Sequence, residues 1–287
     1  MKRITVLLEG GIGNQLWQVA FAHYLSEKIF PNSIVQVKSR FRNGFVLNGL
    51  ENHCQHIVFV KEYPTLRYKF KERLFFHKLS GLPRLKHLTH CESDHDGNKL
   101  SKKTRYVWGY FQNVFFLESY TSPFPSEVLS WLDSYNSDFE VPENWTTVHI
   151  RRGDYTHPLH LPSIGLLKKE YFKQALMALD VSELNLIVFS DCSTVWEIEE
   201  NYALSPKVFF GKQKSDLESL NLLSRSRSIV MSNSTWSWWG AYIASKRFVD
   251  QDVKFALPFP FFKNHPKLRQ EVYFQGVIFV QSQFENH

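Results

Sequence analysis

The stretch of residues 147–155 is Thr147-Val148-His149-Ile150-Arg151-Arg152-Gly153-Asp154-Tyr155. A short apolar strand leads directly into two arginines, a glycine and an aspartate. In an α/β protein, the loops at the carboxyl ends of parallel strands hold the ligand. Paired guanidinium groups at such a position offer a fixed set of donors that suits phosphate oxygens. The stretch therefore predicts a binding site for a phosphorylated ligand.

Strands and helices alternate along most of the chain. Ile4–Leu8 is a continuous apolar run, typical of a buried parallel strand, and a glycine turn and a helical pattern follow it. Similar apolar runs predict strands at residues 34–37, 57–60, 106–111, 146–150, 184–189, 207–210, 228–231 and 254–257. This alternation implies parallel sheets joined by right-handed crossovers.

The chain is expected to form two Rossmann-like α/β domains around a cleft. Pro, Ser, Asp and Glu accumulate at residues 123–142, which suggests a linker around a short helix. We therefore place the first domain at residues 1–140 and the second at 141–287. The C-terminal tail is free in this scheme to pack back on the first domain.

Composition narrows the classes of function. Hydrophobic residues make up 43% and charged residues 22%, the proportions of a folded domain. The net charge of +6 is compatible with nucleic acid, an anionic membrane surface or an anionic ligand. Basic residues are densest at 61–103, which indicates a solvated surface or a patch resting on the cytoplasmic leaflet. The chain has no recognised nucleic-acid-binding module, so we expect no nucleic-acid partner.

Cysteine usage indicates a reducing compartment. Cys54, Cys91 and Cys192 are odd in number and widely separated, and they match neither a disulfide framework nor a zinc pattern. The N-terminal apolar run is too short for a signal peptide, and no run is long enough to span a bilayer. We expect a cytoplasmic protein, with peripheral contact to the inner membrane left open. Asp94-His95-Asp96 resembles a carboxylate pair for a metal, but a solvated turn is the favoured interpretation, so no metal site is predicted.

Three polar clusters follow strands of the second domain. They are Arg151/Arg152/Asp154, Ser190/Asp191 and Asn233/Ser234/Thr235. Their common position at the carboxyl end of the sheet favours a binding site over three unrelated surface groups.

The individual side chains of these clusters suggest different tasks. Strand alternation puts His149 and Arg151 on one side and Arg152 on the other. Asn233, Ser234 and Thr235 precede a helix, whose free backbone amides can bind an anion. Asp191 could contact a guanine, contact a ribose hydroxyl or cap a helix, and the sequence leaves these three roles open.

The glycine turn near the N-terminus matches no standard nucleotide motif. Gly10-Gly11-Ile12-Gly13-Asn14-Gln15 lacks the third glycine of a dinucleotide fingerprint and the lysine of a P-loop. Its glycines let the backbone approach a ligand or the facing domain.

Three sequence blocks resemble the α-1,2-fucosyltransferases of glycosyltransferase family 11. The blocks are Gly10-Gly11-Ile12-Gly13-Asn14-Gln15-Leu16-Trp17-Gln18, His149–Tyr155 and Ser232-Asn233-Ser234-Thr235-Trp236-Ser237-Trp238-Trp239-Gly240-Ala241-Tyr242. Residues 106–112 and 188–191 add weaker matches. The order and spacing of the blocks agree with that family across nearly the whole chain.

The resemblance implies a GT-B architecture, with GDP-fucose held chiefly by the second domain and the acceptor by the first. Members of the family transfer fucose with inversion to the 2-hydroxyl of a galactose, with no cofactor and no required metal. The expected partners are GDP-fucose and a galactose-terminated oligosaccharide or lipid-linked glycan. The glycan would be the repeat of a bacterial O-antigen or another surface polysaccharide, made at the cytoplasmic face of the inner membrane.

The resemblance also implies roles for individual residues. Arg151 would hold the β-phosphate, His149 the nucleotide or the fucose, and Ser234 with Thr235 the pyrophosphate. Further substrate contacts are expected from Gly11, Gly13, Asn14, Gln15, Arg152, Asp191, Asn233, Ser237 and Trp238. Asp154 and His157 are the candidates for a general base. Asp154 could instead orient Arg152, and a reaction without a strong base stays open.

Two departures from the family pattern limit the comparison. Many bacterial relatives carry a second aspartate where this chain has Cys192, so guanine recognition could come from elsewhere. The loop Thr156–Leu167 also differs, which leaves the acceptor open. The alternatives are transfer of another GDP-sugar, formation of another linkage, or a basic nucleic-acid-binding or glycan-binding protein without catalysis.

Overall fold

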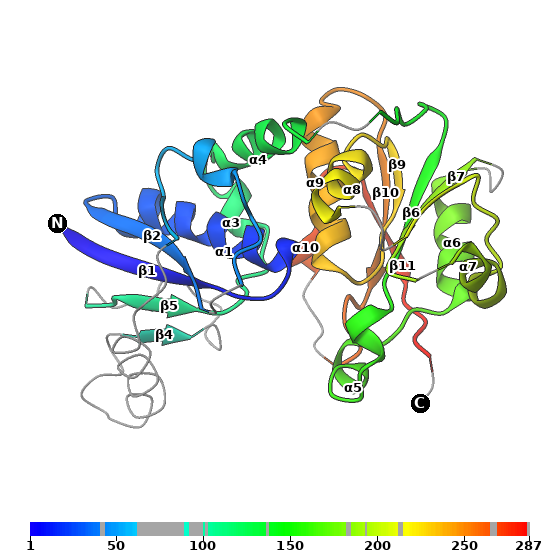
Figure 1. Cartoon of the computed structure of the whole chain (residues 1–287), viewed down its shortest axis with the longest axis horizontal. Helices are drawn as coiled ribbons and strands as arrows, with labels where there is room; N and C mark the ends of the chain where they lie inside the picture. Colours follow the sequence, from blue (N-terminus) through cyan, green and yellow to red (C-terminus); the bar gives the residue numbers. More distant parts are fainter. Residues whose placement is uncertain are drawn as a thin grey trace. The chain divides into compact units, whose positions relative to one another are not determined.

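The computed structural model describes residues 1–40, 44–61, 89–91, 100, 103–135, 138–181, 185–192, 194–211, 215–264 and 269–285. It divides the chain into two compact units, Met1–Glu127 and Val128–His287 (Figure 1). The division falls inside helix α4 (Phe124–Asp133), whereas the sequence places it between residues 140 and 141. Asp94-His95-Asp96 and most of the basic run at 61–103 lie outside the described residues.

The described strands of unit 1 form a parallel sheet in the order β3-β2-β1-β5-β4. Its buried central strand β1 supplies five consecutive buried residues, as its apolar run predicts. Strand β5 is shorter than predicted because Gly109, with a φ of 143°, ends the extended backbone. The elements are β1 (Lys2–Leu8), α1 (Ile12–Tyr24), η1 (Leu25–Ile29), β2 (Ser33–Ser39), η2 (Leu50–Asn52), β3 (Val58–Val60), β4 (Thr89–Cys91), β5 (Tyr106–Trp108) and α3 (Phe115–Glu118).

Unit 2 contains a larger parallel sheet in the order β11-β10-β9-β6-β7-β8. Figure 1 shows helices α6 and α7 on one face of this sheet and α8 and α9 on the other. The elements are β6 (Thr146–Ile150), η5 (Gly153–Thr156), α5 (Leu161–Ile164), α6 (Lys169–Leu179), β7 (Leu186–Ser190), α7 (Val195–Tyr202), β8 (Val208–Phe210), α8 (Asp216–Leu223), β9 (Ser228–Val230), α9 (Thr235–Arg247), β10 (Lys254–Phe259), α10 (Arg269–Val272) and β11 (Val277–Gln281). Two parallel sheets confirm the predicted α/β class with Rossmann-like units.

The C-terminal segment differs from the sequence prediction, which ends the strands at 254–257. Strand β11 pairs in parallel with β10, from Phe255 opposite Val277 to Phe259 opposite Gln281. The Glu285 N–H then donates to the carbonyl of Leu166 at 2.8 Å. The described part of the tail therefore belongs to unit 2, because the apolar residues of β11 complete its sheet.

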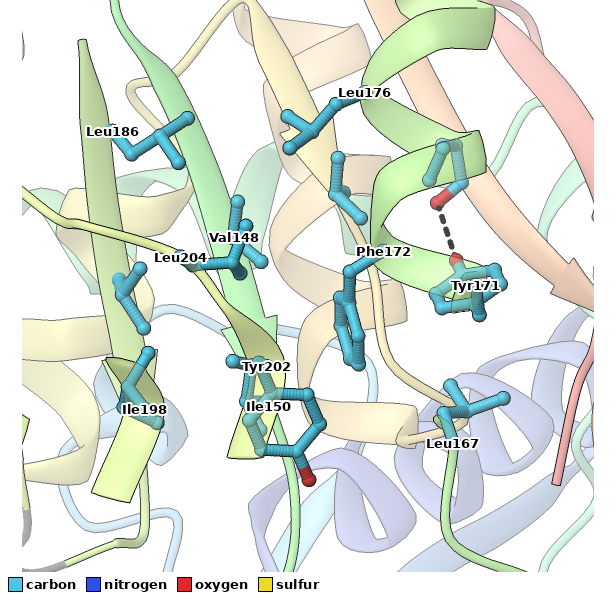
Figure 2. Close-up of a cluster of buried hydrophobic side chains, with 14 of the residues drawn as sticks. Val148, Ile150, Leu167, Tyr171, Phe172, Leu176, Leu186, Ile198, Tyr202 and Leu204 are labelled. Carbon is cyan, nitrogen blue, oxygen red and sulfur yellow. Dashed lines mark hydrogen bonds between the residues drawn. The ribbon is translucent and has the colours of Figure 1, made fainter. Parts of the chain in front are cut away.

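Helix α6 forms one layer of the unit 2 core (Figure 2). Its face of Phe172, Ala175, Leu176 and Leu179 is fully buried, as the helical spacing predicts. Burial of each large apolar side chain contributes about 1.5–3 kcal/mol to stability. The Tyr171 hydroxyl from the same helix donates to the carbonyl of Met231 at 2.6 Å. This bond fixes α6 to the chain just beyond β9, where the candidate site begins.

We predict that Tyr171→Phe lowers the free energy of unfolding by about 1–3 kcal/mol, because the buried Met231 carbonyl loses the hydroxyl that approaches it at 2.6 Å. Urea denaturation of the purified protein measures this change. Tyr273→Phe is the matched control: its ring is 49% exposed, and the change should stay within about 0.5 kcal/mol. Equal effects of the two substitutions would contradict the prediction.

Candidate functional site

The sheet of unit 2 has a point at which the strand order reverses. From β6 the chain builds outward through β7 to β8, and it then returns to the other side of β6 with β9, β10 and β11. In open α/β sheets, ligands bind beyond the carboxyl ends of the two strands that flank such a point. Arg151 follows β6 and Ser232 follows β9, so these two segments define the candidate site.

The carboxylate of Asp191 organises the turn that follows β6. Its Oδ1 accepts the backbone N–H of Arg152 at 2.7 Å, and its Oδ2 lies 3.1 Å from Nη1 of Arg151. A Cβ atom on residue 153 would lie 2.2 Å from that Oδ2, so only glycine fits there. Asp191 therefore positions the arginine turn, which we define as residues 151–154. This role differs from the three that the sequence left open for Asp191.

Arg151 points into the site and keeps its charge. Its guanidinium pairs with Asp154 at 2.6 Å and with Asp191, and its side chain is 35% exposed. Burial alone would lower the pKa of Arg151, but Asp191 and then Asp154 raise it above its ordinary value. The contact with Asp154 is a hydrogen bond from Nη2, whereas Oδ2 of Asp191 approaches Nη1 as an ion pair without hydrogen-bond geometry. The remaining N–H groups of the guanidinium are donors that suit phosphate oxygens.

Arg152 points away from Arg151, as strand alternation predicts. Its Nη1 donates to the Tyr202 hydroxyl and to Glu285, each at 3.0 Å. Burial would lower the pKa of Arg152, whereas Tyr202 and Glu285 raise it. Arg152 thus ties β6 to α7 and to the C-terminal segment, and the structure does not bring its guanidinium together with that of Arg151.

His149 lies behind the site as a neutral ring. Its Nδ1 is 2.8 Å from the Ser232 hydroxyl, and its ring centroid lies 4.7 Å from that of Trp236. Burial and then the nearby charge of Arg151 lower the pKa of His149 to about 3. A neutral imidazole links the ends of β6 and β9 without adding charge at pH 7.

The N-terminus of α9 forms the other side of the site. Ser234 is the N-cap and accepts the backbone N–H of Trp236 at 3.3 Å, and the first turn has no acidic residue. The positive end of the helix dipole is therefore not offset by a carboxylate within that turn. The hydroxyl of Tyr155, on the neighbouring loop, donates to the Asn233 carbonyl at 3.1 Å and also forms a hydrogen bond with the Ser234 side chain. Thr235, the first helical residue, is half-buried.

Three predicted ligand contacts in this segment have their polar groups engaged by the protein. The Asn233 side-chain amide donates to the carbonyl of Gly165 at 3.0 Å. The Ser237 hydroxyl donates to the Ser234 carbonyl at 3.1 Å, and Trp238 donates to Val272 at 2.9 Å. The side chains of Ser237 and Trp238 are buried. The structure thus places Ser237 and Trp238 beneath the site as support.

The glycine turn of unit 1 lies at a similar reversal of strand order, between β1 and β5. Gly10 has a φ of 79°, and Gly11 is the exposed N-cap of α1, with nothing within 4 Å of a Cβ placed there. Gly13 is buried in the first turn of α1. Asn14 is half-buried and its Oδ1 accepts from Gln112 at 3.1 Å. The exposed part of the turn is therefore the backbone at Gly10 and Gly11.

Gln15 holds this turn from inside. It is fully buried, and its Nε2 donates to the Gly10 carbonyl at 2.9 Å and to that of Gly44. Its Oε1 accepts the Val46 N–H at 3.2 Å. The structure consequently places Gln15 as a support for the turn, not at its surface.

The two candidate bases lie on the exposed loop after β6. Asp154 is 59% exposed and pairs with Arg151. His157 is exposed, and its Nδ1 accepts the N–H of Leu159 at 3.2 Å. The structure brings Asp154 to the guanidinium of Arg151, whereas the Nδ1 of His157 is used within its own loop.

Sequence reasoning missed several residues that shape these turns. Tyr155, Tyr202 and Glu285 hold the arginine turn and its neighbours, and Gln18 bridges β1 and β5. Tyr155 and Gln18 lie inside the quoted family blocks, so the blocks themselves carried a signal for them. Glu285 had none, because it reaches Arg152 from 133 positions away.

Comparison with known proteins places this geometry in a family. The family model "Glycosyl transferase family 11" matches residues 86–259, more than half of the 287 residues. The chain belongs to glycosyl transferase family 11. The match confirms the resemblance that the sequence blocks suggested. The protein is therefore a glycosyltransferase of family 11.

Two curated relatives come from Escherichia coli. The O-antigen biosynthesis glycosyltransferase WbnK is 29% identical over 278 residues, covering 82% of this chain and 88% of the relative. An alpha-1,2-colitosyltransferase is 24% identical over 270 residues, covering 85% of this chain and 88% of the relative. The family 11 enzyme is thus similar to both over most of their length.

Solved structures give more remote matches. A glycosyl transferase family 9 protein from Veillonella parvula has a TM-score of 0.48 at 11% identity, covering 100% of this chain and 88% of that one. The NodZ alpha-1,6-fucosyltransferase co-crystallized with GDP has a TM-score of 0.44 at 14% identity, covering 84% and 92%. Both likenesses concern the fold only. Within the described residues, no helix has the length and apolar character needed to cross a membrane.

We predict that Gly153→Ala destabilises the protein by about 1–3 kcal/mol, because the alanine Cβ would lie only 2.2 Å from Oδ2 of Asp191. Urea denaturation of four proteins measures the effect: wild type, Gly153→Ala, Asp191→Ala and the double variant. Removal of the carboxylate removes the overlap, so the double variant should be no less stable than Asp191→Ala. Full additivity of the two single effects would contradict the proposed contact.

Proposed function

We propose that this family 11 glycosyltransferase moves fucose from GDP-fucose, with inversion, to the 2-hydroxyl of a terminal galactose. The observation that carries the proposal is the guanidinium of Arg151, held by Asp191 beside the N-terminus of α9. A fixed cation and a helix N-terminus are both suited to phosphate groups. The sugar and the linkage come from the resemblance to α-1,2-fucosyltransferases.

The chemistry needs stabilisation of the leaving GDP. As the bond from the anomeric carbon to the β-phosphate oxygen breaks, negative charge grows on the pyrophosphate. Arg151 and the positive end of the α9 helix dipole supply preorganised positive potential for this charge. In this proposal the protein itself does the work of a leaving-group cation, so no cofactor or metal is needed for transfer.

We propose that guanine is recognised by residues outside the segment that follows β7. Asp191 uses its carboxylate on Arg151 and on the Arg152 N–H. Cys192 is buried, and burial raises the pKa of its thiol, so it stays neutral at pH 7. The carboxylate of Asp191 is already engaged, and Cys192 has a thiol in place of a carboxylate. In this proposal the contacts to guanine therefore come from other residues.

The acceptor hydroxyl requires a route for its proton. Asp154 is the better candidate for the general base, since it is exposed and Arg151 fixes its carboxylate next to the phosphate-binding donors. His157 on the same loop is the alternative. The backbone of Gly11 and the side chain of Asn14 at the turn of unit 1 are proposed to contact the acceptor.

The names of the relatives support a proposal for the acceptor glycan and for the location of the enzyme. The O-antigen name of one relative suggests that the acceptor is a lipid-linked repeat of a surface polysaccharide. Such repeats would be reached by a cytoplasmic enzyme resting on the inner membrane. The name of the other relative favours colitose as a second candidate for the transferred sugar.

A transfer assay tests the proposal directly. The purified enzyme is incubated with GDP-fucose and a panel of β-galactosides, and GDP release is measured together with the linkage of the product by NMR. We expect release of GDP that depends on the acceptor and an α-1,2-linked product. Activity with GDP-colitose but not with GDP-fucose would favour the second candidate, and silence with both sugars across the panel would refute the proposal.

We predict that substitutions of Arg151 and Arg152 affect different properties of the enzyme. Arg151→Lys keeps a charge but loses the planar set of donors, so we expect kcat to fall by roughly 10²–10³, as for a lost oxyanion donor. Arg152→Lys, which changes the contacts to Tyr202 and Glu285, should lower stability and leave kcat within about tenfold. Steady-state kinetics and urea denaturation of both variants measure this. The reverse assignment of effects would overturn the role given to Arg151.

A further inference from the structure

A second group of chemically reactive side chains lies in unit 1. His23 on α1, Cys54 in the segment after η2 and Glu127 in the first turn of α4 place one ligand atom each within 4.8 Å of one another. The three residues come from segments far apart in the sequence. His23 and Cys54 are buried, and the Glu127 side chain is 11% exposed.

Glu127 forms hydrogen bonds with the Cys54 side chain and the Gln55 backbone, but three other polar atoms of this cluster lack partners. Both ring nitrogens of His23 and the Oε2 of Glu127 are buried without a hydrogen-bond partner. His23 Nε2 and Glu127 Oε2 approach to 3.2 Å, which is an ion-pair distance without hydrogen-bond geometry. Buried polar atoms are nearly always satisfied in folded proteins. Nε2 of His23 and Oε2 of Glu127 are two unsatisfied atoms that face each other near Cys54, an arrangement that a bound cation would satisfy.

The donor types define the chemistry of that partner. Imidazole nitrogen, thiolate sulfur and carboxylate oxygen are the three ligand classes that Zn²⁺ accepts, in tetrahedral geometry. Burial, and then the nearby His56, lower the pKa of His23 to about 3, so its ring is neutral and able to coordinate. Burial, and then Glu127, raise the pKa of the Cys54 thiol, so a metal has to displace its proton.

We propose that His23, Cys54 and Glu127 bind one zinc ion, with a water molecule as the fourth ligand. The metal would join α1, the segment after η2 and the start of α4. It would also satisfy one buried ring nitrogen of His23 and the buried Oε2 of Glu127. This site belongs to unit 1, whereas the arginine turn belongs to unit 2. The proposal is therefore independent of the transfer reaction and of the donor sugar.

Cobalt titration of the full-length enzyme, stripped with a chelator, tests the proposal. Co²⁺ alone is added as the spectroscopic substitute for Zn²⁺, and absorption, proton release and thermal unfolding are followed. We expect one Co²⁺ per chain, a thiolate-to-cobalt charge-transfer band, release of the thiol proton and a higher unfolding temperature. Zinc should then displace the cobalt and abolish the band.

Single substitutions assign the ligands. Cys54→Ser should remove the charge-transfer band, and His23→Gln and Glu127→Gln should each weaken binding by more than the roughly 10–100-fold typical of outer-shell partners. Cys91→Ser and Cys192→Ser are the matched controls and should retain the band. Failure of the folded wild type to bind cobalt stoichiometrically would overturn the proposal. A band that survives Cys54→Ser would overturn it as well.

Discussion

The carboxylate of Asp191 is the contact on which the candidate site depends. It joins the chain after β7 to the backbone of Arg152 at 2.7 Å and to the guanidinium of Arg151 at 3.1 Å. The order of residues in the arginine turn follows from it. Arg151 faces the site, Arg152 turns away to the C-terminal segment, Gly153 leaves room for the carboxylate, and Asp154 pairs with Arg151 on its exposed side.

This arrangement keeps Arg151 charged and fixed between two carboxylates, while the nearby rings of His149 and Tyr155 stay neutral. His149 is deprotonated by burial and by the charge of Arg151, so it adds no second cation. Tyr155 is also neutral, because burial raises its pKa. The low-dielectric surroundings strengthen the field of Arg151 on a bound phosphate. Fixed dipoles and one held charge can stabilise a leaving group because they need no reorganisation during the reaction.

The sequence predicted best where local pattern decides structure. The apolar run at 146–150 gave β6 with its observed bounds, and alternation gave the opposite directions of Arg151 and Arg152. Strand β11 was missed, since an edge strand near a chain end has no helix after it to complete the alternating pattern. Family blocks located the turns but did not tell supporting from exposed side chains.

Three examples show why the roles of individual side chains could not be predicted without the three-dimensional fold. Gln15 lies in a family block, yet its amide is consumed by the carbonyls of Gly10 and Gly44. Trp238 follows the site in sequence, but α9 is buried on most sides and takes the ring into the core. The cluster of His23, Cys54 and Glu127 has no motif spacing, because long-range topology alone brings its members together.

In each unit a polar side chain links the ends of two neighbouring strands, and these side chains differ in charge. In unit 1, Gln18 accepts the Glu9 N–H after β1 at 2.9 Å and donates to the Gly109 carbonyl after β5 at 2.8 Å. A neutral amide thus bridges the strand ends there, where unit 2 has the carboxylate of Asp191. Glu9 is itself paired with Arg40 at 2.5 Å. A neutralised turn suits hydroxyl groups, and the guanidinium of Arg151 suits phosphates, which fits the proposal that unit 1 contacts the glycan and unit 2 the nucleotide.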